Sequence, residues 1–344
     1  MHSFYLGLRR IFTVLLGLVF FASGVFKLMD PVGTGFIVEE YCKFLHLAFM
    51  VPASKVVGVA LSLTESLVGI SLLSGVMSRI AGVVASVMTL LFTVITVLLL
   101  VFNPPMDCGC FGQVLHLTHL QSLIKNLVLL VFCVVAFIPL WDGFRPWGSK
   151  YVAFGIVSVA VVCFAIYSLV RLPLIDFTPF APGMEIYSGE NEGEMLPIRD
   201  LSGEYCDDLA TEGAVLIISL PDGRKISASR YEEITRLADS ALSLGIRPLV
   251  LASSFEGVPA ELLEYLYFAD RRELLTLNRS NGGASLIVDS VITAKFAARS
   301  LPEPETLSSL CDTPAAELAS ERIARGRIVL QSFLLLSSAL LILL

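Results

Sequence analysis

Two cysteines separated by a single glycine, Cys108 and Cys110, are the residues best suited to chemistry in this sequence. They lie in a polar stretch, 103–113, that is flanked on both sides by long apolar runs. A Cys-X-Cys pair can close an internal disulfide only with strain, and strained disulfides are the more oxidising and more easily exchanged kind. The spacing supports thiol redox chemistry. A structural disulfide and two inert cysteines are the alternatives.

The residues that follow the pair predict features that would activate a thiol. Thr118 and Gln121 form a capping-box pattern, which marks the start of a helix. The N-terminus of that helix would direct partial positive charge toward the cysteines, and Lys125 would lie in its first turns. Both features lower the pKa of a nearby thiol and favour the thiolate, which is the reactive form.

A third cysteine, Cys42, lies in the predicted loop 30–51. It is the natural candidate to resolve a disulfide formed at Cys108 or Cys110. The alternative is a lone loop cysteine with no role in the chemistry.

Two histidines near the same polar stretch, His116 and His119, raise the question of a metal site. The pattern Cys-X-Cys followed by His-x-x-His lacks the spacing usual between zinc-ligating cysteines. We therefore predict no metal centre here.

Polar side chains inside apolar runs form a second set of candidates. Glu65 lies deep in the run 53–75, where a carboxyl group is costly and is by default a candidate for function. Lys27 and Lys55 are its candidate partners. Glu65 would relay protons or line a quinone pocket, or else hold helices together through a shared proton or ion pair. Asn126, inside a later apolar run, has the same two interpretations.

The composition is that of a membrane protein. Of 344 residues, 55% are hydrophobic and only 16% are charged, whereas soluble domains are nearer 25% charged. The segment 173–326 has 13 Lys and Arg against 25 Asp and Glu, while the rest of the chain has 11 against 6. A membrane part with basic edges therefore carries an acidic, water-facing part. No basic patch suggests nucleic-acid binding.

Six apolar runs are close to the roughly 20 residues that a helix needs to cross a bilayer. They are 11–26, 53–75, 80–102, 120–140, 151–172 and the shorter 328–344. The first run resembles a signal peptide, but several longer spans follow it and the sequence after it is a poor cleavage site, so we interpret it as an uncleaved helix.

Basic residues orient these spans, because positively charged loops stay in the cytoplasm. The residues on the side assigned to the cytoplasm are Arg9, Arg10, Arg79, Arg145 and Lys150. The cysteine stretch, the loop 30–51 and the acidic part then lie outside. The basic residues before the last span argue the other way, but long translocated domains override such charges. They are Arg322, Arg325 and Arg327.

The acidic part, 173–326, shows the strand–helix alternation of a small α/β sheet. The predicted strands are 214–220, 247–252 and 284–289, and the predicted helices are 229–244 and 259–269. Ser229 and Glu232 form a capping-box pattern at the first of these helices.

This part resembles a thioredoxin fold that lacks its chemistry. After the strand 214–220, where a thioredoxin would have Cys-x-x-Cys, the chain has Pro-Asp-Gly-Arg-Lys at 221–225. Cys206 and Cys311 lie away from that position, and they either pair with each other or stay free. We interpret the domain as a docking module.

Taken together, these motifs resemble the DoxX/MauE group of membrane proteins, in the Bacteroidetes-type variant with an appended thioredoxin-like domain. The matching stretches are 21–33, 40–41, the helix around Glu65, Asp-Cys-Gly-Cys-Phe-Gly at 107–112, Lys125 with Asn126, and 172–179. A late motif, 279–283, departs from the variant by having Gly282 in place of proline, and the last span is also a departure. The resemblance covers 1–180 well and the rest weakly.

The resemblance implies a four-helix transmembrane bundle, which we place at 1–145. Together with the spans and the α/β pattern described above, it leads us to expect a mostly α membrane protein with a fifth transmembrane helix at 146–172, an extracytoplasmic α/β domain at 173–326 and a last transmembrane helix at 327–344. It also implies a role in periplasmic redox chemistry or in the maturation of partner proteins. Our first hypothesis is thiol redox at Cys108 and Cys110, linked to a quinone. The side chains expected to contact the quinone are Lys27, Glu65, Lys125 and Asn126.

The second hypothesis is an accessory or maturation subunit without turnover, which docks periplasmic client proteins through the α/β domain. A small-molecule transporter has little support from so few intramembrane polar groups. Under either of the first two hypotheses the partners are the lipid bilayer and a periplasmic thiol or client protein. The oligomeric state, whether a homo-oligomer or a larger membrane complex, is left open.

Overall fold

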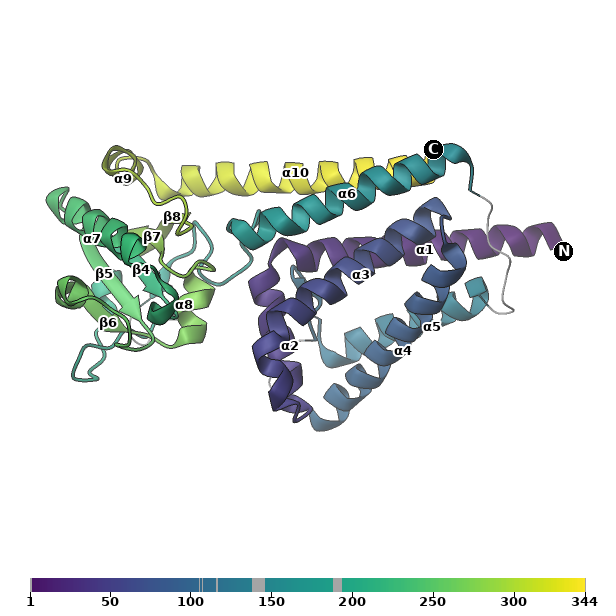
Figure 1. Ribbon diagram of the computed structural model, residues 1–344, viewed down its shortest axis with the longest axis horizontal. Helices are drawn as coiled ribbons and strands as arrows, with labels where there is room; N and C mark the ends of the chain where they lie inside the picture. The colour runs from purple at the N-terminus through teal and green to yellow at the C-terminus, as the bar shows by residue number, and fades with distance from the viewer. Residues whose placement is uncertain are drawn as a thin grey trace. The chain divides into compact units, whose positions relative to one another are not determined.

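The computed structural model describes residues 2–104, 106, 108–115, 117–137, 146–187 and 194–343 (Figure 1). The chain divides into two compact units. The first consists of Met1–Val170 with Val329–Leu344, and the second is Arg171–Ile328. The predicted cytoplasmic Arg145 and the end of the predicted span 120–140 lie outside the described residues.

Six described helices are long and apolar enough to cross a membrane, which confirms the predicted number of spans. They are α1 (His2–Met29), α3 (Ser54–Ser74), α4 (Ser78–Phe102), α5 (His119–Phe137), α6 (Gly148–Val170) and α10 (Ala315–Leu343). Large apolar side chains such as Leu90, Val94 and Val131 are exposed on the outside of this helical unit, as lipid-facing residues must be. The protein is a multi-pass membrane protein.

Helices α1 and α3 approach each other closely, because glycines remove the side chains between them. A Cβ on Gly24 would lie 2.3 Å from Oγ of Ser66, and a Cβ on Gly69 would lie 2.4 Å from the backbone nitrogen of Phe21. Small residues allow this kind of backbone approach between membrane helices. The contact brings polar residues of α1 against the buried middle of α3.

The prediction of a loop at 30–51 is wrong, because most of this segment is helical. It forms α2 (Pro31–Phe44) and the 3₁₀ helix η1 (Ala48–Ala53). The carboxylate of Asp30 accepts a hydrogen bond of 2.9 Å from the backbone N–H of Gly33, and Pro31 occupies the first turn, where its missing N–H costs nothing. Cys42 therefore lies on a helix.

The cysteine stretch begins where α4 ends. Asn103 closes that helix with a left-handed backbone (φ 42°), and Pro104 follows, so the helix ends where the predicted span 80–102 ends. The chain then runs through Gly109 into the short extended segment β1 (Cys110–Gln113), which lies against the end of α1. A Cβ on Gly112 would lie 3.4 Å from Cα of Lys27.

Helix α6 and the end of α10 lie side by side (Figure 1). The ring centroids of Phe164 and Phe333 are 5.8 Å apart. Nζ of Lys150 donates to the backbone carbonyls of Leu341 and Ile342, at 2.8 and 2.7 Å. A cation placed this way satisfies carbonyl groups that the end of a helix leaves unpaired.

The second unit is built on a mixed five-stranded sheet with the order β6-β5-β4-β7-β8 (Figure 1). Its strands are β4 (Ala214–Leu220), β5 (Arg247–Ala252), β6 (Leu266–Phe268), β7 (Gly283–Val288) and β8 (Val291–Phe296). The first three pair in parallel, and β7 is antiparallel to both β4 and β8. A separate two-stranded pairing joins β2 (Ile186–Tyr187) and β3 (Glu194–Met195).

Two of the predicted strands, 214–220 and 247–252, have the same bounds in the structure, while two local predictions are wrong. The predicted helix 259–269 is a 3₁₀ helix, η4 (Ala260–Tyr265), followed directly by β6, because its last residues pair with β5. Helix α7 (Ala228–Ser243) begins earlier than predicted, so Ser227 rather than Ser229 occupies its cap position.

Helices cover both faces of this sheet. On one face lie α7 and α9 (Pro304–Cys311), with Ile234, Leu237 and Leu307 in the core. On the other face lie α8 (Arg271–Leu277) and the segment that enters the domain, with Leu274 and Phe180 in a second core. Short 3₁₀ turns, η2 (Asp207–Ala210) and η3 (Gly223–Lys225), complete the domain.

Candidate functional site

Seven of the side chains selected from the sequence line one cavity inside the helical unit. The cavity has a volume of about 350 Å³ and a mostly apolar lining. Its lining includes Lys27 of α1, Cys42 of α2, Glu65 of α3, Cys108 and Cys110 of the loop after α4, and Lys125 and Asn126 of α5. Residues that are far apart in the sequence are therefore gathered around one space of small-molecule size.

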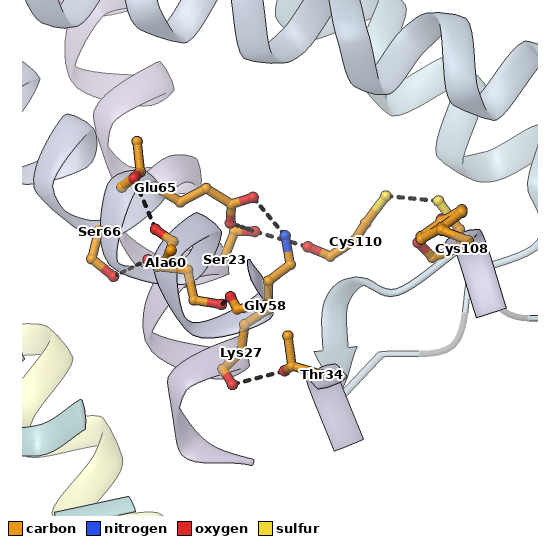
Figure 2. Close-up of polar contacts among 12 residues, drawn as sticks. Ser23, Lys27, Thr34, Gly58, Ala60, Glu65, Ser66, Cys108 and Cys110 are labelled. Carbon is orange, nitrogen blue, oxygen red and sulfur yellow. Dashed lines mark hydrogen bonds and ion pairs between the residues drawn. The ribbon is translucent and has the colours of Figure 1, made fainter. Parts of the chain in front are cut away.

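The two sulfur atoms of the Cys-Gly-Cys stretch face each other. Sγ of Cys108 lies 2.9 Å from Sγ of Cys110, and both cysteines are free thiols in this structure (Figure 2). Gly109 between them has a left-handed backbone (φ 61°), and a Cβ there would lie 2.4 Å from Cγ2 of Ile37. Only glycine suits this position, because other residues rarely adopt this backbone conformation and because any side chain would collide with α2.

Hydrogen bonds fix the backbone on both sides of that glycine. The hydroxyl of Tyr41 donates to the carbonyl of Cys108, and Oγ of Ser23 lies 2.8 Å from the carbonyl oxygen of Cys110. Burial raises the pKa of the Tyr41 phenol, so its hydroxyl keeps the proton that it donates. The loop is therefore held against α1 and α2, and its sulfur atoms face the cavity.

The pKa values of the two thiols are shifted in opposite directions. The hydrogen bond from Cys108, followed by the charges of Lys125 and Lys27, lowers the pKa of Cys110 despite its burial. The pKa of Cys108 is raised, because Cys108 supplies that hydrogen bond and is buried. Cys110 is therefore the thiol of the pair that ionises first.

Glu65 is paired with a cation inside the bundle. Its Oε1 lies 2.6 Å from Nζ of Lys27, and its Oε2 lies 2.8 Å from Oγ of Ser23 (Figure 2). The side chains of Lys27 and Glu65 are only 11% and 2% exposed. Lys55, the other partner considered for Glu65, is exposed near the start of α3. A buried carboxylate and a buried ammonium group thus stand beside the cysteine loop.

Helix α5 presents its own polar groups to the cavity. Thr118 and Gln121 form the predicted capping box, with reciprocal hydrogen bonds of 3.0 and 3.2 Å. Nζ of Lys125 lies 5.1 Å from the ring centroid of Phe111. The amide of Asn126 donates to Oγ1 of Thr96 on α4, at 3.0 Å.

The remaining cysteines have different surroundings. Cys42 is buried, and it lines the cavity as a free thiol. Cys133 is buried in the core of the helical unit, whereas Cys163 is exposed on α6. Cys206 and Cys311 contact the cores on opposite faces of the sheet, so they are free and the alternative of a mutual disulfide does not hold.

The described residues contain no group of three or more His, Cys, Asp or Glu side chains that could hold a metal ion. Nε2 of His119 lies 3.4 Å from the carbonyl oxygen of Pro104, across the cysteine stretch. His116 lies outside the described residues.

In the second unit, the turn after β4 carries ion pairs. Nζ of Lys225 lies 2.9 Å from Oδ2 of Asp222, and Nε of Arg224 lies 3.6 Å from Oδ1 of Asp222. The side chain of Asn281 joins the same turn, because its amide donates to the carbonyl of Asp222 at 2.8 Å. This turn has no thiol, as the sequence 221–225 requires.

Sequence reasoning missed Ser23 and Tyr41 as site residues. Ser23 lies four residues before Lys27, so both belong to one face of α1, and that spacing was the available signal. Tyr41 directly precedes Cys42, but nothing in the local pattern indicated that its hydroxyl would reach Cys108.

Comparison with protein families finds one match, over residues 7–142, to the family described as methylamine utilisation protein MauE. The matched residues contain every side chain named above that lines the cavity. Comparison with curated proteins and with solved structures gives no match.

Proposed function

We propose that this multi-pass membrane protein, which is of the MauE family over residues 7–142, exchanges electrons between protein thiols and a membrane quinone through Cys108 and Cys110. One observation carries the proposal: the facing thiols line the same apolar cavity as two ammonium groups and a buried carboxylate. A structural cysteine pair would not require such surroundings.

The redox step involves both thiols. When the pair is oxidised, one S–S bond forms and two electrons and two protons pass to the quinone, which becomes a quinol; the reverse transfer restores the dithiol. Cys110 initiates exchange as the thiolate, because Lys125 and the Cys108 thiol stabilise its charge. Cys42, on the wall of the same cavity, is the candidate to resolve a mixed disulfide.

The cavity has the chemistry that a quinone headgroup requires. Its volume of about 350 Å³ falls within the range of small-molecule sites, and its walls are mainly apolar. Lys27 and Lys125 supply donors to carbonyl oxygens, and Asn126 supplies an amide. These residues would orient the headgroup and exclude water from the sulfur atoms.

We further propose that the cysteine loop and the second unit face the periplasm of a bacterial inner membrane. The second unit would be a degenerate thioredoxin-like domain that docks client proteins. Its order of elements, β4–α7–β5 followed by the β7–β8 hairpin and α9, supports this assignment. The ion-paired turn at Asp222 supports docking rather than catalysis by the domain itself.

A second candidate function is an accessory or maturation subunit without turnover. The description of the matched family, methylamine utilisation protein, names a process and no reaction. In this case the cysteine pair would hold the loop in place and would not cycle.

The test is a thiol count on the full chain in lipid nanodiscs. The protein is reduced, freed of reductant and mixed with a short-chain ubiquinone, and free thiols and quinol are measured together. We expect two thiols lost for each quinol formed, no quinol from Cys108→Ser or Cys110→Ser, and normal activity from the control Cys163→Ser. Unchanged thiols in the wild type, or quinol formation by both serine variants, would exclude the redox function.

A further inference from the structure

The cavity of the candidate site is lined by two kinds of side chain. Polar ones, among them Lys27, Glu65 and Lys125, gather beside the cysteine loop. Aliphatic ones come from η1, α3 and α4, and they are Met50, Val57, Leu61, Leu91 and Ile95. A ligand that fills this space therefore has a polar part that reaches the loop and an apolar part that lies along these helices.

The cavity opens to the outside of the bundle at α4. Leu91 lines the cavity and is nevertheless 51% exposed, more than any other lining residue that the structure describes. Ile95, one turn further along α4, and Leu61 on α3 also line the cavity and are only partly buried. The mouth of the cavity thus lies between α3 and α4, which meet at the turn 75–77 and diverge toward α2 (Figure 1).

This mouth lies at the depth of the lipid chains. Leu61 comes seven residues after the start of α3 at Ser54, which at 1.5 Å per residue places it about 10 Å along its span. Ile95 comes seven residues before the end of α4 at Phe102, so it lies equally far inside. Nearer the surface, the rings of Phe44 and Phe102, with centroids 6.0 Å apart, join the ends of α2 and α4. The mouth therefore faces hydrocarbon and not water.

The size of the cavity adds a further constraint on its ligand. A volume of about 350 Å³ is enough for a small ring system with its polar substituents, but not for a long isoprenoid chain as well. A membrane quinone in this cavity needs an exit for its chain, and the mouth beside Leu91 is an apolar exit that leads into the lipid.

We propose that the gap between α3 and α4 is a lateral portal, through which the chain of an isoprenoid quinone extends into the bilayer while its headgroup lies beside the cysteine loop. The ligand enters from the lipid and does not pass through water. Leu91 forms the outer edge of the portal. The identity of the headgroup rests on the proposed function, to which the portal adds the route of entry and the requirement for an apolar chain.

The experiment compares two maleimides on the reduced full chain in lipid nanodiscs. One carries a dodecyl chain and partitions into the bilayer, as the proposed ligand does, and the other carries a sulfonate group and stays in water. The reporter is Cys42, which is buried and lines the cavity. A Cys108→Ser/Cys110→Ser background leaves Cys42 as the one thiol among the described lining residues. Peptide mass spectrometry gives the labelling rates.

We expect the dodecyl reagent to label Cys42 faster than the sulfonate reagent does. Leu91→Trp overfills the portal and should slow the dodecyl reagent roughly fivefold, whereas Leu91→Ala should accelerate it. The matched control is Leu90, which is 57% exposed on the same helix and is not among the lining residues, so Leu90→Trp and Leu90→Ala should leave the rate unchanged. Cys163, exposed on α6 and labelled in the same samples, shows that the reagent reaches each variant.

Faster labelling of Cys42 by the sulfonate reagent would overturn the proposal, because the cavity would then be entered from water. Equal slowing by Leu90→Trp and Leu91→Trp would overturn it as well, and so would a dodecyl rate that responds to neither Leu91 variant. Labelling needs no quinone. An absence of quinol formation would therefore refute the proposed function, while the portal stands or falls on the labelling of Cys42.

Discussion

Nζ of Lys27 and Oε1 of Glu65 lie 2.6 Å apart in the interior of the helical unit, where each side chain is almost fully removed from solvent. The pair joins α1 to α3 at the level of the cysteine loop, which Ser23 contacts from the same helical face. Removing one member of a buried ion pair is far more costly than replacing both, because it strands the other charge.

We expect Lys27→Met to destabilise the protein by about 3 kcal/mol, while the double variant Lys27→Met/Glu65→Met recovers most of this loss. Unfolding by sodium dodecyl sulfate in mixed micelles measures the free energy of unfolding of both variants. A double variant as unstable as the single one would show that the ion pair itself, and not the stranded carboxylate, sets the stability.

The close contact of α1 with α3 predicts a second effect on stability. A Cβ at Gly24 would lie 2.5 Å from the backbone nitrogen of Ser66 and 2.6 Å from the carbonyl oxygen of Ser62, so the two helices would have to separate. We expect Gly24→Ala to cost about 2 kcal/mol in the same unfolding assay. Gly155→Ala on α6 is the matched control, because its added Cβ meets nothing within 4 Å. An equal loss of unfolding free energy in the two variants would contradict the tight contact between α1 and α3.

The sequence predicted these spans and candidates because their signals are local. Six apolar runs, an acidic side chain inside one of them and a Thr118–Gln121 capping box are each visible within a few residues. The gathering of Cys42, Glu65 and Lys125 around one cavity follows from helix packing, which one sequence does not reveal.

The failures have physical causes as well. Helix α2 (Pro31–Phe44) has a mixed face of glycines and charges, so no apolar period marked it, although Asp30 and Pro31 form a good helix start. The segment 259–269 divides into a 3₁₀ helix and β6, because pairing with β5 overrides its helical pattern. Ser23 was overlooked because a small hydroxyl residue in an apolar helix normally bonds to its own backbone.

The acidity of Cys110 predicts a pH dependence. Because its pKa is lowered, the thiolate persists at pH values where an ordinary cysteine is protonated, and alkylation of Cys110 should remain fast as the pH falls through the neutral range. Lys125→Met removes a stabilising charge, so the pKa should rise and the rate at mildly acidic pH should fall roughly tenfold. Lys43→Met, at an exposed lysine paired with Glu39, is the control and should leave the rate unchanged. A pH profile unaffected by Lys125→Met would contradict the assignment.

The second unit should contain two cysteines that never pair. Because Cys206 and Cys311 contact cores on opposite faces of the sheet, no disulfide can join them without disrupting the fold. We expect mild oxidation of the full chain to leave both thiols available to alkylation after unfolding. A peptide cross-linked between these two cysteines would show that the sheet in this structure is wrong.

The last prediction concerns the buried pair between Lys295 on β8 and Asp176 in the segment that enters the second unit. Nζ of Lys295 lies 2.6 Å from Oδ2 of Asp176, and the backbone N–H of Thr178 donates to Oδ1 at 2.9 Å. Burial alone would raise the pKa of Asp176, but Lys295 and Thr178 together lower it below its ordinary value. The pair therefore stabilises the folded domain fully above the unfolded pKa of about 3.9, and this contribution is lost as the pH falls through the lower, folded value.

We expect Asp176→Asn to destabilise the domain by about 3 kcal/mol at neutral pH and to remove the part of the acid sensitivity that this carboxyl group causes. Hydrogen–deuterium exchange of β8 in the full chain measures the effect. The double variant Asp176→Leu/Lys295→Met, which removes both charges, should exchange more slowly than Asp176→Asn. If Asp176→Asn leaves exchange at neutral pH unchanged, then the ion pair does not hold the entering segment on the sheet.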